Sequence, residues 1–194
     1  MGKKPKKGIT PKHLRPDQLI YQLKVSLIGI KPPIWRRIQV TGDTTLDVLH
    51  GILQIAMGWF GEHLYDFEVH GTSYGDPSVL DDIIDEKTVN LAQLISLEKE
   101  KFRYVYDFGD YWKHDILVEK ILPVEDGTHY PVCIDGNRAC PPEDCGGHFG
   151  YDDLLEILKD PDHPEHEDKF EWLPGDFDPE KFDIEYVNRQ LGGS

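Results

Sequence analysis

Residues 101–122 read KFRYVYDFGDYWKHDILVEKIL, and this stretch decides the predicted fold. Its first eight residues place an aromatic side chain at every second position, which is the period of a β-strand with one buried face. Gly109 and Asp110 favour a turn, and the alternation of apolar and polar residues resumes after it. We therefore predict an antiparallel hairpin with strands at residues 101–108 and 112–122.

A second hairpin is predicted near the start of the chain. Residues 21–30 and 34–40 each alternate apolar with polar side chains, and two consecutive prolines lie in the short connection between them. Residues 64–71 have the composition of a further strand, and residues 88–95 that of a short helix.

Three helices are expected to cover this sheet. Apolar residues recur with helical spacing from Thr45 until Gly58, and a second helical pattern covers residues 151–158. A third helix is expected to open at Pro179 and to run to about Gly192, after an acidic loop at residues 160–168. Together these elements predict one α+β domain over residues 17–192, with a curved, mostly antiparallel sheet and helices packed on it.

Charge is distributed unevenly between a short tail and the rest of the chain. Six of the 21 basic residues precede residue 16, whereas all 36 acidic residues follow it, so residues 16–194 carry 15 basic and 36 acidic residues and a net charge of −21. We expect residues 1–16 to form a basic, disordered tail. No long apolar run or secretory signal is present, which predicts a cytoplasmic protein without a membrane segment.

This charge argues against direct nucleic-acid binding by the folded domain. Lysine and arginine side chains supply most of the affinity for a phosphate backbone, and an acidic surface repels it. The aromatic face of residues 101–108 has the spacing of a base-stacking platform, but its surroundings are acidic. We therefore assign that face to the hydrophobic core.

Four carboxylates lie at predicted turns beside rigid glycines or prolines. Carboxylates held close together at strand ends bind divalent cations through oxygen or act as an acid and base pair, with a nearby histidine as a further base. The alternative is that they stabilise turns and cap the helix near residue 151. The catalytic candidates are Asp107, Asp110, His114, Glu143 and Asp144.

Residues 140–151 read CPPEDCGGHFGY and contain the other candidate metal ligands. Cys140, Cys145 and His148 offer sulfur and nitrogen donors for zinc, but their spacing lacks the two close pairs that make zinc motifs specific. Packing of the cysteines beneath a rigid turn is the alternative, and we expect no metal at these residues.

The motifs YDFGDYWKHDILVEKI, CPPEDCGGHFGY and PPIWRRIQV together resemble the plasmid pRi ORF-3-like family of uncharacterised proteins. The resemblance covers about residues 18–190 and implies a compact α+β domain. Relatives often carry an apolar residue in place of Cys145 and a proline in place of His148, which implies that zinc binding is no family property.

The sequence favours a binding or adaptor module with an acidic surface and a polar cleft. The cleft is formed by the turn after Phe108, the strand that carries Trp112 and His114, and the loop at residues 141–151. Tyr106, Trp112 and Tyr151 are the expected binding residues, and a basic protein or a small cationic ligand is the expected partner. In this cleft His114 would face Glu143 or Asp144, which would raise its pKa.

Two alternatives remain open at this stage, and the sequence does not decide whether the protein is an enzyme. The first is a hydrolase that depends on a divalent metal and uses the clustered carboxylates with His114 as base. The second is an acidic partner of a DNA-binding protein from a plasmid or mobile element. No cofactor is required, although a divalent cation fits the first alternative.

Overall fold

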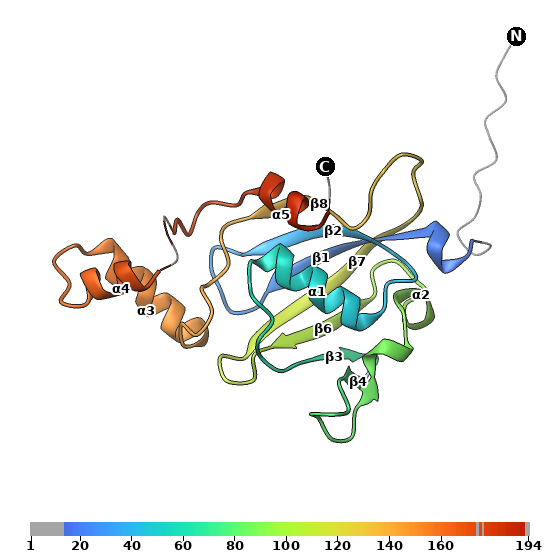
Figure 1. The fold of residues 1–194 in the computed structure, drawn as a ribbon, viewed down its shortest axis with the longest axis horizontal. Helices are drawn as coiled ribbons and strands as arrows, with labels where there is room; N and C mark the ends of the chain where they lie inside the picture. Colours follow the sequence, from blue (N-terminus) through green and yellow to red (C-terminus); the bar gives the residue numbers. More distant parts are fainter. Residues whose placement is uncertain (1–13, 174, 176, 193–194) are drawn as a thin grey trace, which may run out of the picture.

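The computed structural model describes residues 14–173, 175 and 177–192. Eight strands form one open sheet in the order β5-β4-β3-β6-β7-β1-β2-β8, and every neighbouring pair is antiparallel except β4 and β5 (Figure 1). The strands are β1 (Leu19–Leu27), β2 (Trp35–Thr41), β3 (Tyr65–Val69), β4 (Thr72–Gly75), β5 (Ile84–Asp85), β6 (Lys101–Tyr106), β7 (Trp112–Pro123) and β8 (Val132–Asn137).

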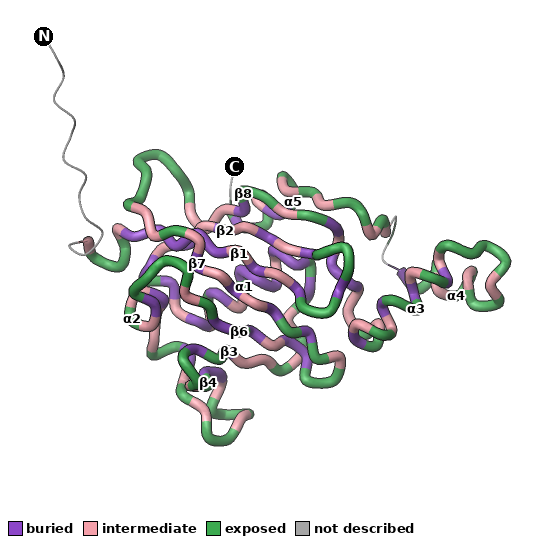
Figure 2. The backbone as a smooth tube through the Cα atoms, turned by 180° about the vertical axis from the view of Figure 1, so that it is seen from behind, coloured by how far each residue is buried: buried purple, intermediate pink, exposed green. Residues whose placement is uncertain are grey.

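Both predicted hairpins are confirmed, and together they form the centre of the sheet. β6 pairs with β7 with Tyr104 opposite His114, and β1 pairs with β2 on one side and with β7 on the other. Buried residues concentrate along these central strands (Figure 2). The expected single α+β fold with a mostly antiparallel sheet is therefore correct.

Helix α1 (Leu46–Met57) lies across one face of the sheet (Figure 1). Its buried side chains recur every three or four residues, so one stripe of the helix faces the strands. Thr45 takes the N-cap position, and Gly58 ends the helix at φ 91°, a left-handed conformation that glycine adopts without steric cost.

The remaining helices are short or differ from the prediction. They are α2 (Leu91–Leu94), α3 (Gly147–Lys159), α4 (His166–Trp172) and α5 (Ile184–Gln190), with 3-10 turns η2 (Pro16–Gln18) and η3 (Glu86–Thr88). The last helix does not open at Pro179, because the Asp183 side chain caps the helix at Ile184 by accepting from the Tyr186 N–H at 2.8 Å.

Two further expectations need correction, and a third falls mostly on residues that the structure does not describe. Helix α3 begins four residues before Tyr151, at the Gly146–Gly147 pair, and it lies with α4 beyond one end of the sheet rather than on its face (Figure 1). The expected acidic loop at residues 160–168 already contains the first turn of α4. Of the basic tail predicted for residues 1–16, residues 1–13 lie outside the described residues.

The C-terminal helix α5 lies beside the edge strand β8. The Asn188 side chain accepts from the Cys133 N–H at 2.7 Å and donates to the Cys133 carbonyl at 2.8 Å. A single amide side chain thus satisfies both outward backbone groups of one edge residue. Within the described ranges, no helix has the length and apolarity needed to cross a membrane.

Candidate functional site

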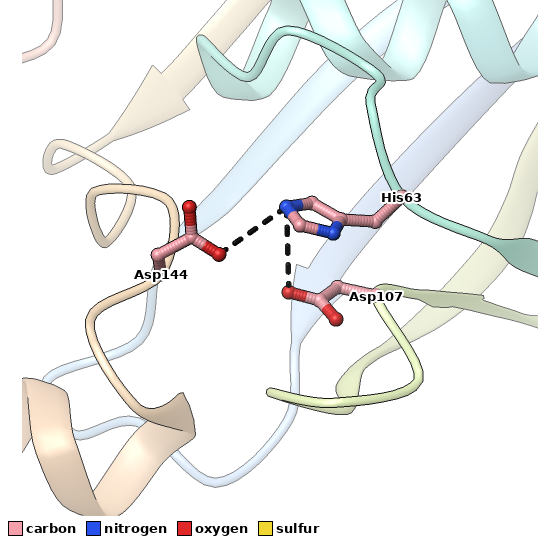
Figure 3. A group of neighbouring side chains, drawn as sticks. All are labelled: His63, Asp107 and Asp144. Atoms are coloured by element: carbon pink, nitrogen blue, oxygen red, sulfur yellow. Dashed lines mark ion pairs between the residues drawn. The ribbon is translucent and has the colours of Figure 1, made fainter.

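Three segments that are distant in the sequence meet at one end of the sheet. They are the loop between α1 and β3, the turn between β6 and β7, and the segment that enters α3. Each contributes one side chain to a common point, namely His63, Asp107 and Asp144 (Figure 3). Within the described ranges, the ligand atoms of these three side chains lie close enough together to hold one metal ion.

The imidazole of His63 lies between the two carboxylates. Its Nε2 atom is 3.3 Å from Oδ1 of Asp144 and 3.9 Å from Oδ2 of Asp107, and all three ligand atoms lie within 4.8 Å of one another. Ligand atoms bound to one metal at about 2.0–2.2 Å lie at most about 4 Å apart. Both distances from His63 Nε2 meet this limit, and the 4.8 Å bound on all three atoms is slightly above it.

Asp107 presents one carboxylate oxygen to the site and uses the other for the turn. Oδ1 accepts from the N–H groups of Gly109 at 2.8 Å and Asp110 at 3.2 Å, which leaves Oδ2 to face His63. The residue is only 6% exposed and has φ 59°. A left-handed conformation is costly for a residue with a side chain and is often retained at functional sites.

Asp144 also has a left-handed backbone, at φ 57°, and its neighbour Glu143 anchors it. Oε1 of Glu143 accepts a hydrogen bond from the Tyr106 hydroxyl and another from the Phe60 N–H at 3.2 Å. Burial and the Glu143 carboxylate raise the Tyr106 pKa, so the phenol stays protonated and remains a donor. Glu143 thereby ties the segment before α3 to β6 and to the loop after α1.

A second set of contacts holds the same segments together. Oδ2 of Asp110 accepts from the Gly146 N–H at 3.1 Å, and Trp59 Nε1 donates to the Pro141 carbonyl at 2.8 Å. Gly147 packs so closely on the turn that an added Cβ would lie 2.6 Å from the Asp110 carbonyl oxygen. We call these contacts, with the Tyr106–Glu143 hydrogen bond, the loop clamp. It fixes Asp107 and Asp144 on either side of His63.

The structure therefore divides the four predicted carboxylates into two pairs. Asp107 and Asp144 converge on one point, whereas Asp110 and Glu143 form the loop clamp. The capping alternative is correct only in part, because Asp110 rather than Glu143 or Asp144 accepts from the residue before α3.

The expected contact between His114 and a carboxylate is wrong. His114 is 1% exposed on β7, and its Nδ1 lies 3.4 Å from the Tyr104 carbonyl. Burial lowers its pKa to about 4, opposite to the expected direction. The cause is the strand register, which directs this side chain into the core beside Trp59 rather than toward the loops.

The expected binding residues Tyr106, Trp112 and Tyr151 are buried in the core rather than exposed in the cleft. All three are at most 2% exposed. Tyr106 and Trp112 stack against Trp59 with ring centroids 5.1 and 6.0 Å away, and burial raises the pKa of Tyr151 to about 12. Tyr106 and Trp112 lie on the inner face of β6 and β7, and Tyr151 lies on the buried side of α3. The Tyr106 hydroxyl reaches a site loop, where it donates to Glu143.

The sulfur candidates do not gather around a common point. Cys140 is buried against Met57 and Arg36, and His148 packs against the Phe149 ring at the start of α3. Burial raises the thiol pKa of Cys140, and it raises that of Cys145 to about 12, so both stay protonated. Cys140, Cys145 and His148 form no shared ligand group.

His63 is the site residue that sequence reasoning missed. Its place in the site follows from the pairing of β3 with β6, in which Tyr65 lies opposite Tyr106. The Asp107 N–H then donates to the Leu64 carbonyl at 2.8 Å, which brings His63 alongside Asp107. Recognising that pairing in the sequence would have identified the histidine.

A cavity of about 430 Å³ adjoins the site and shares Asp144 with it. It lies between the start of α3 and helix α4. Its charged lining comprises four carboxylates and one amine, so it is acidic, and the half-exposed Trp172 ring forms part of its wall. The charged residues are Asp144, Asp153, Glu165, Asp168 and Lys169.

Comparison with known proteins places this fold and sequence in a family. The model of the plasmid pRiA4b ORF-3-like proteins matches residues 19–186. The chain belongs to the plasmid pRiA4b ORF-3-like family. The uncharacterized protein y4hQ of Sinorhizobium fredii is 37% identical over 176 residues, which cover 89% of this chain and 90% of that protein.

A crystal structure of a similar protein supports the same fold. Protein MM3350 of Methanosarcina mazei, described as of unknown function, has 44% sequence identity and a TM-score of 0.81. The match covers 87% of this chain and 97% of that one. The family predicted from the three sequence motifs is thus confirmed.

Proposed function

We propose that this pRiA4b ORF-3-like protein is a binding module whose polar cleft holds a divalent cation. The main support is that His63, Asp107 and Asp144 converge from three separate segments. Nε2 of His63 lies 3.3 Å from the Asp144 carboxylate and 3.9 Å from that of Asp107. The loop clamp and the left-handed backbone of both aspartates support this proposal, because they fix groups that would otherwise repel each other.

The donor set indicates which cations the site prefers. One imidazole nitrogen with two carboxylate oxygens suits zinc, manganese, cobalt or iron rather than calcium, which takes six to eight oxygen ligands. Three protein ligands also leave coordination positions open. A water molecule or a second ligand can occupy these positions and so link the ion to a partner.

We expect a positively charged partner, which binds in the acidic cavity next to the metal-binding group. The cavity beside Asp144 supports this, because four carboxylates and one lysine line it and Trp172 offers an aromatic face. A lysine or arginine side chain of a basic protein, or a small amine, fits this chemistry. The open coordination positions then allow the same partner to reach the ion.

Metal binding is tested by isothermal titration of the purified apoprotein with Zn²⁺, Mn²⁺ and Co²⁺, with Ca²⁺ as the hard-cation control. Substitution of a residue that only supports a metal ligand typically weakens metal affinity about 10- to 100-fold. We expect a larger loss of affinity in each of three ligand variants, namely His63→Gln, Asp107→Asn and Asp144→Asn. Asp107→Asn retains an Oδ1 acceptor for the turn. The matched controls are His70→Gln and Asp126→Asn on exposed surfaces away from the site.

Equal affinity in the wild type and in all three site variants would refute the proposal. So would the absence of any heat or thermal shift with the borderline metals in a protein that remains folded. Circular dichroism of each variant separates lost binding from lost structure.

Metal-dependent hydrolysis is the second candidate, and one observation favours it. Catalytic zinc sites keep three protein ligands and an open position, which is the number found here. His114 cannot serve as the base because it is buried in the core. Hydrolysis of p-nitrophenyl acetate and p-nitrophenyl phosphate by the metal-loaded protein, lost in Asp144→Asn, would support this candidate. A turnover unaffected by chelation would exclude it.

A further inference from the structure

Arg36 on strand β2 is a buried cation without a carboxylate partner among the described residues. It is 2% exposed. The other arginines nearby are paired: Arg37 contacts Glu119 at 2.6 Å, and the buried Arg138 contacts Glu180 at 2.7 Å. A buried charge is costly unless a counter-charge and hydrogen bonds compensate it.

The hydrogen bonds of Arg36 satisfy one side of its guanidinium group. Nε donates to the Ala56 carbonyl at 2.8 Å, and Nη1 donates to the carbonyls of Trp35 and Asn137 at 2.9 and 3.0 Å. Ala56 lies in the last turn of α1, whose carbonyl end carries only about half a negative charge. Among the described residues, carbonyl dipoles rather than a carboxylate therefore face this charge.

The remaining nitrogen of Arg36 lacks an oxygen acceptor among the described residues. Nη2 lies 3.4 Å from Sγ of Cys140, and a thiol is a weak acceptor. The Phe182 ring covers the face of the guanidinium group, with its centroid 3.9 Å from Cζ. The ring blocks approach from that face and leaves the Nη2 edge as the donor.

Arg36 and Cys140 both line a cavity of about 220 Å³ between the end of α1 and the start of α5. The charged residues in its wall are Arg36, Lys181 and Asp183, so the lining carries a net positive charge in a protein of net charge −15. One oxygen of Asp183 already accepts from the Tyr186 N–H. The exposed Lys181 is the second cation available to a ligand.

We propose that this cavity binds a small oxyanion, namely a carboxylate or a phosphate group. An oxygen of the anion accepts from Nη2 of Arg36, and Lys181 compensates the remaining charge. The volume lies below the about 300–1,000 Å³ of pockets for drug-sized ligands, so the site fits a group of a few heavy atoms rather than a nucleotide. This inference is independent of the metal-binding group at His63.

The proposal is tested by thermal unfolding of the full chain in sodium phosphate or sodium acetate, with sodium chloride keeping the ionic strength constant. A ligand that binds only the folded state raises the melting temperature in a saturable way. Lys181→Gln is the main variant, because its side chain is exposed and its loss leaves the core unchanged. It should raise the dissociation constant about tenfold or more. The matched control, Lys101→Gln on β6, should bind as the wild type.

Each outcome supports or overturns the proposal. A saturable response to phosphate alone or to acetate alone identifies which anion the site takes. No response to either anion beyond that of chloride overturns the proposal, as does an unchanged dissociation constant in Lys181→Gln. Arg36→Lys, which retains the charge but removes Nη2, should also lose binding if it folds.

Discussion

Acidification should destabilise this protein between pH 7 and pH 4, and His114 should account for a large part of the effect. Its imidazole is fully buried, and burial lowers its pKa from about 6.5 to about 4. The folded protein therefore favours the neutral imidazole over the protonated one. As the pH falls through this window, the unfolded chain binds a proton that the folded protein does not, so the free energy of unfolding decreases.

The magnitude follows from the size of this pKa shift. One pH unit corresponds to about 1.4 kcal/mol, so the full shift is worth about 3 kcal/mol. About 2 kcal/mol of this loss should occur between pH 7 and pH 5. His50, whose pKa burial also lowers to about 4, should add a loss of the same sign in the same window.

The assay is urea unfolding of the wild type and of His114→Gln at pH 7 and pH 5. The variant is less stable at pH 7, because it loses packing against Trp59 and Tyr104. Its loss of unfolding free energy between the two pH values should nevertheless be about 2 kcal/mol smaller than that of the wild type. Equal losses in both proteins would refute the argument, since they would show that His114 does not carry the titration. His129→Gln, at an exposed position, is the control and should behave as the wild type.

Two further predictions concern the loop clamp. Tyr106→Phe removes the hydroxyl that donates to Glu143, and urea unfolding should show a loss of about 1.5–3 kcal/mol; a loss below 0.5 kcal/mol would contradict the assigned role. Gly147→Ala places a Cβ 2.6 Å from the Asp110 carbonyl oxygen at a residue with φ 68°, and it should lower the free energy of unfolding by more than about 2 kcal/mol. Gly127 has a similar φ of 82° but open space around it, so Gly127→Ala should lower it by only about 1–2 kcal/mol. Equal costs for the two glycine variants would show that the close contact is absent.

The central fold was predictable because local patterns and long-range packing agree there. The alternation of residues 101–122 and the turn at Gly109 specify a hairpin without further information. β8 was missed because its sequence VCIDGN alternates weakly and contains a glycine. Its strand character comes from pairing with β2 rather than from its own residues.

The site was only partly predictable for a related reason. Asp107 and Asp144 follow from turn chemistry, which the sequence displays directly. His63 lies in a loop without a local pattern, and only the pairing of β3 with β6 brings it beside Asp107. His114 was assigned to the cleft because alternation identifies the face of a strand but does not reveal which loops lie above that face.

Asn188 has a consequence for how this protein behaves at high concentration. The outer edge of a sheet normally offers unpaired N–H and C=O groups to any extended chain that approaches. Here the amide of Asn188 takes the place of a neighbouring strand at Cys133, and at the opposite edge β5 is only two residues long. These two features make strand addition at either edge of the sheet less favourable. Keeping α5 docked is therefore a safeguard against aggregation as well as a contribution to stability.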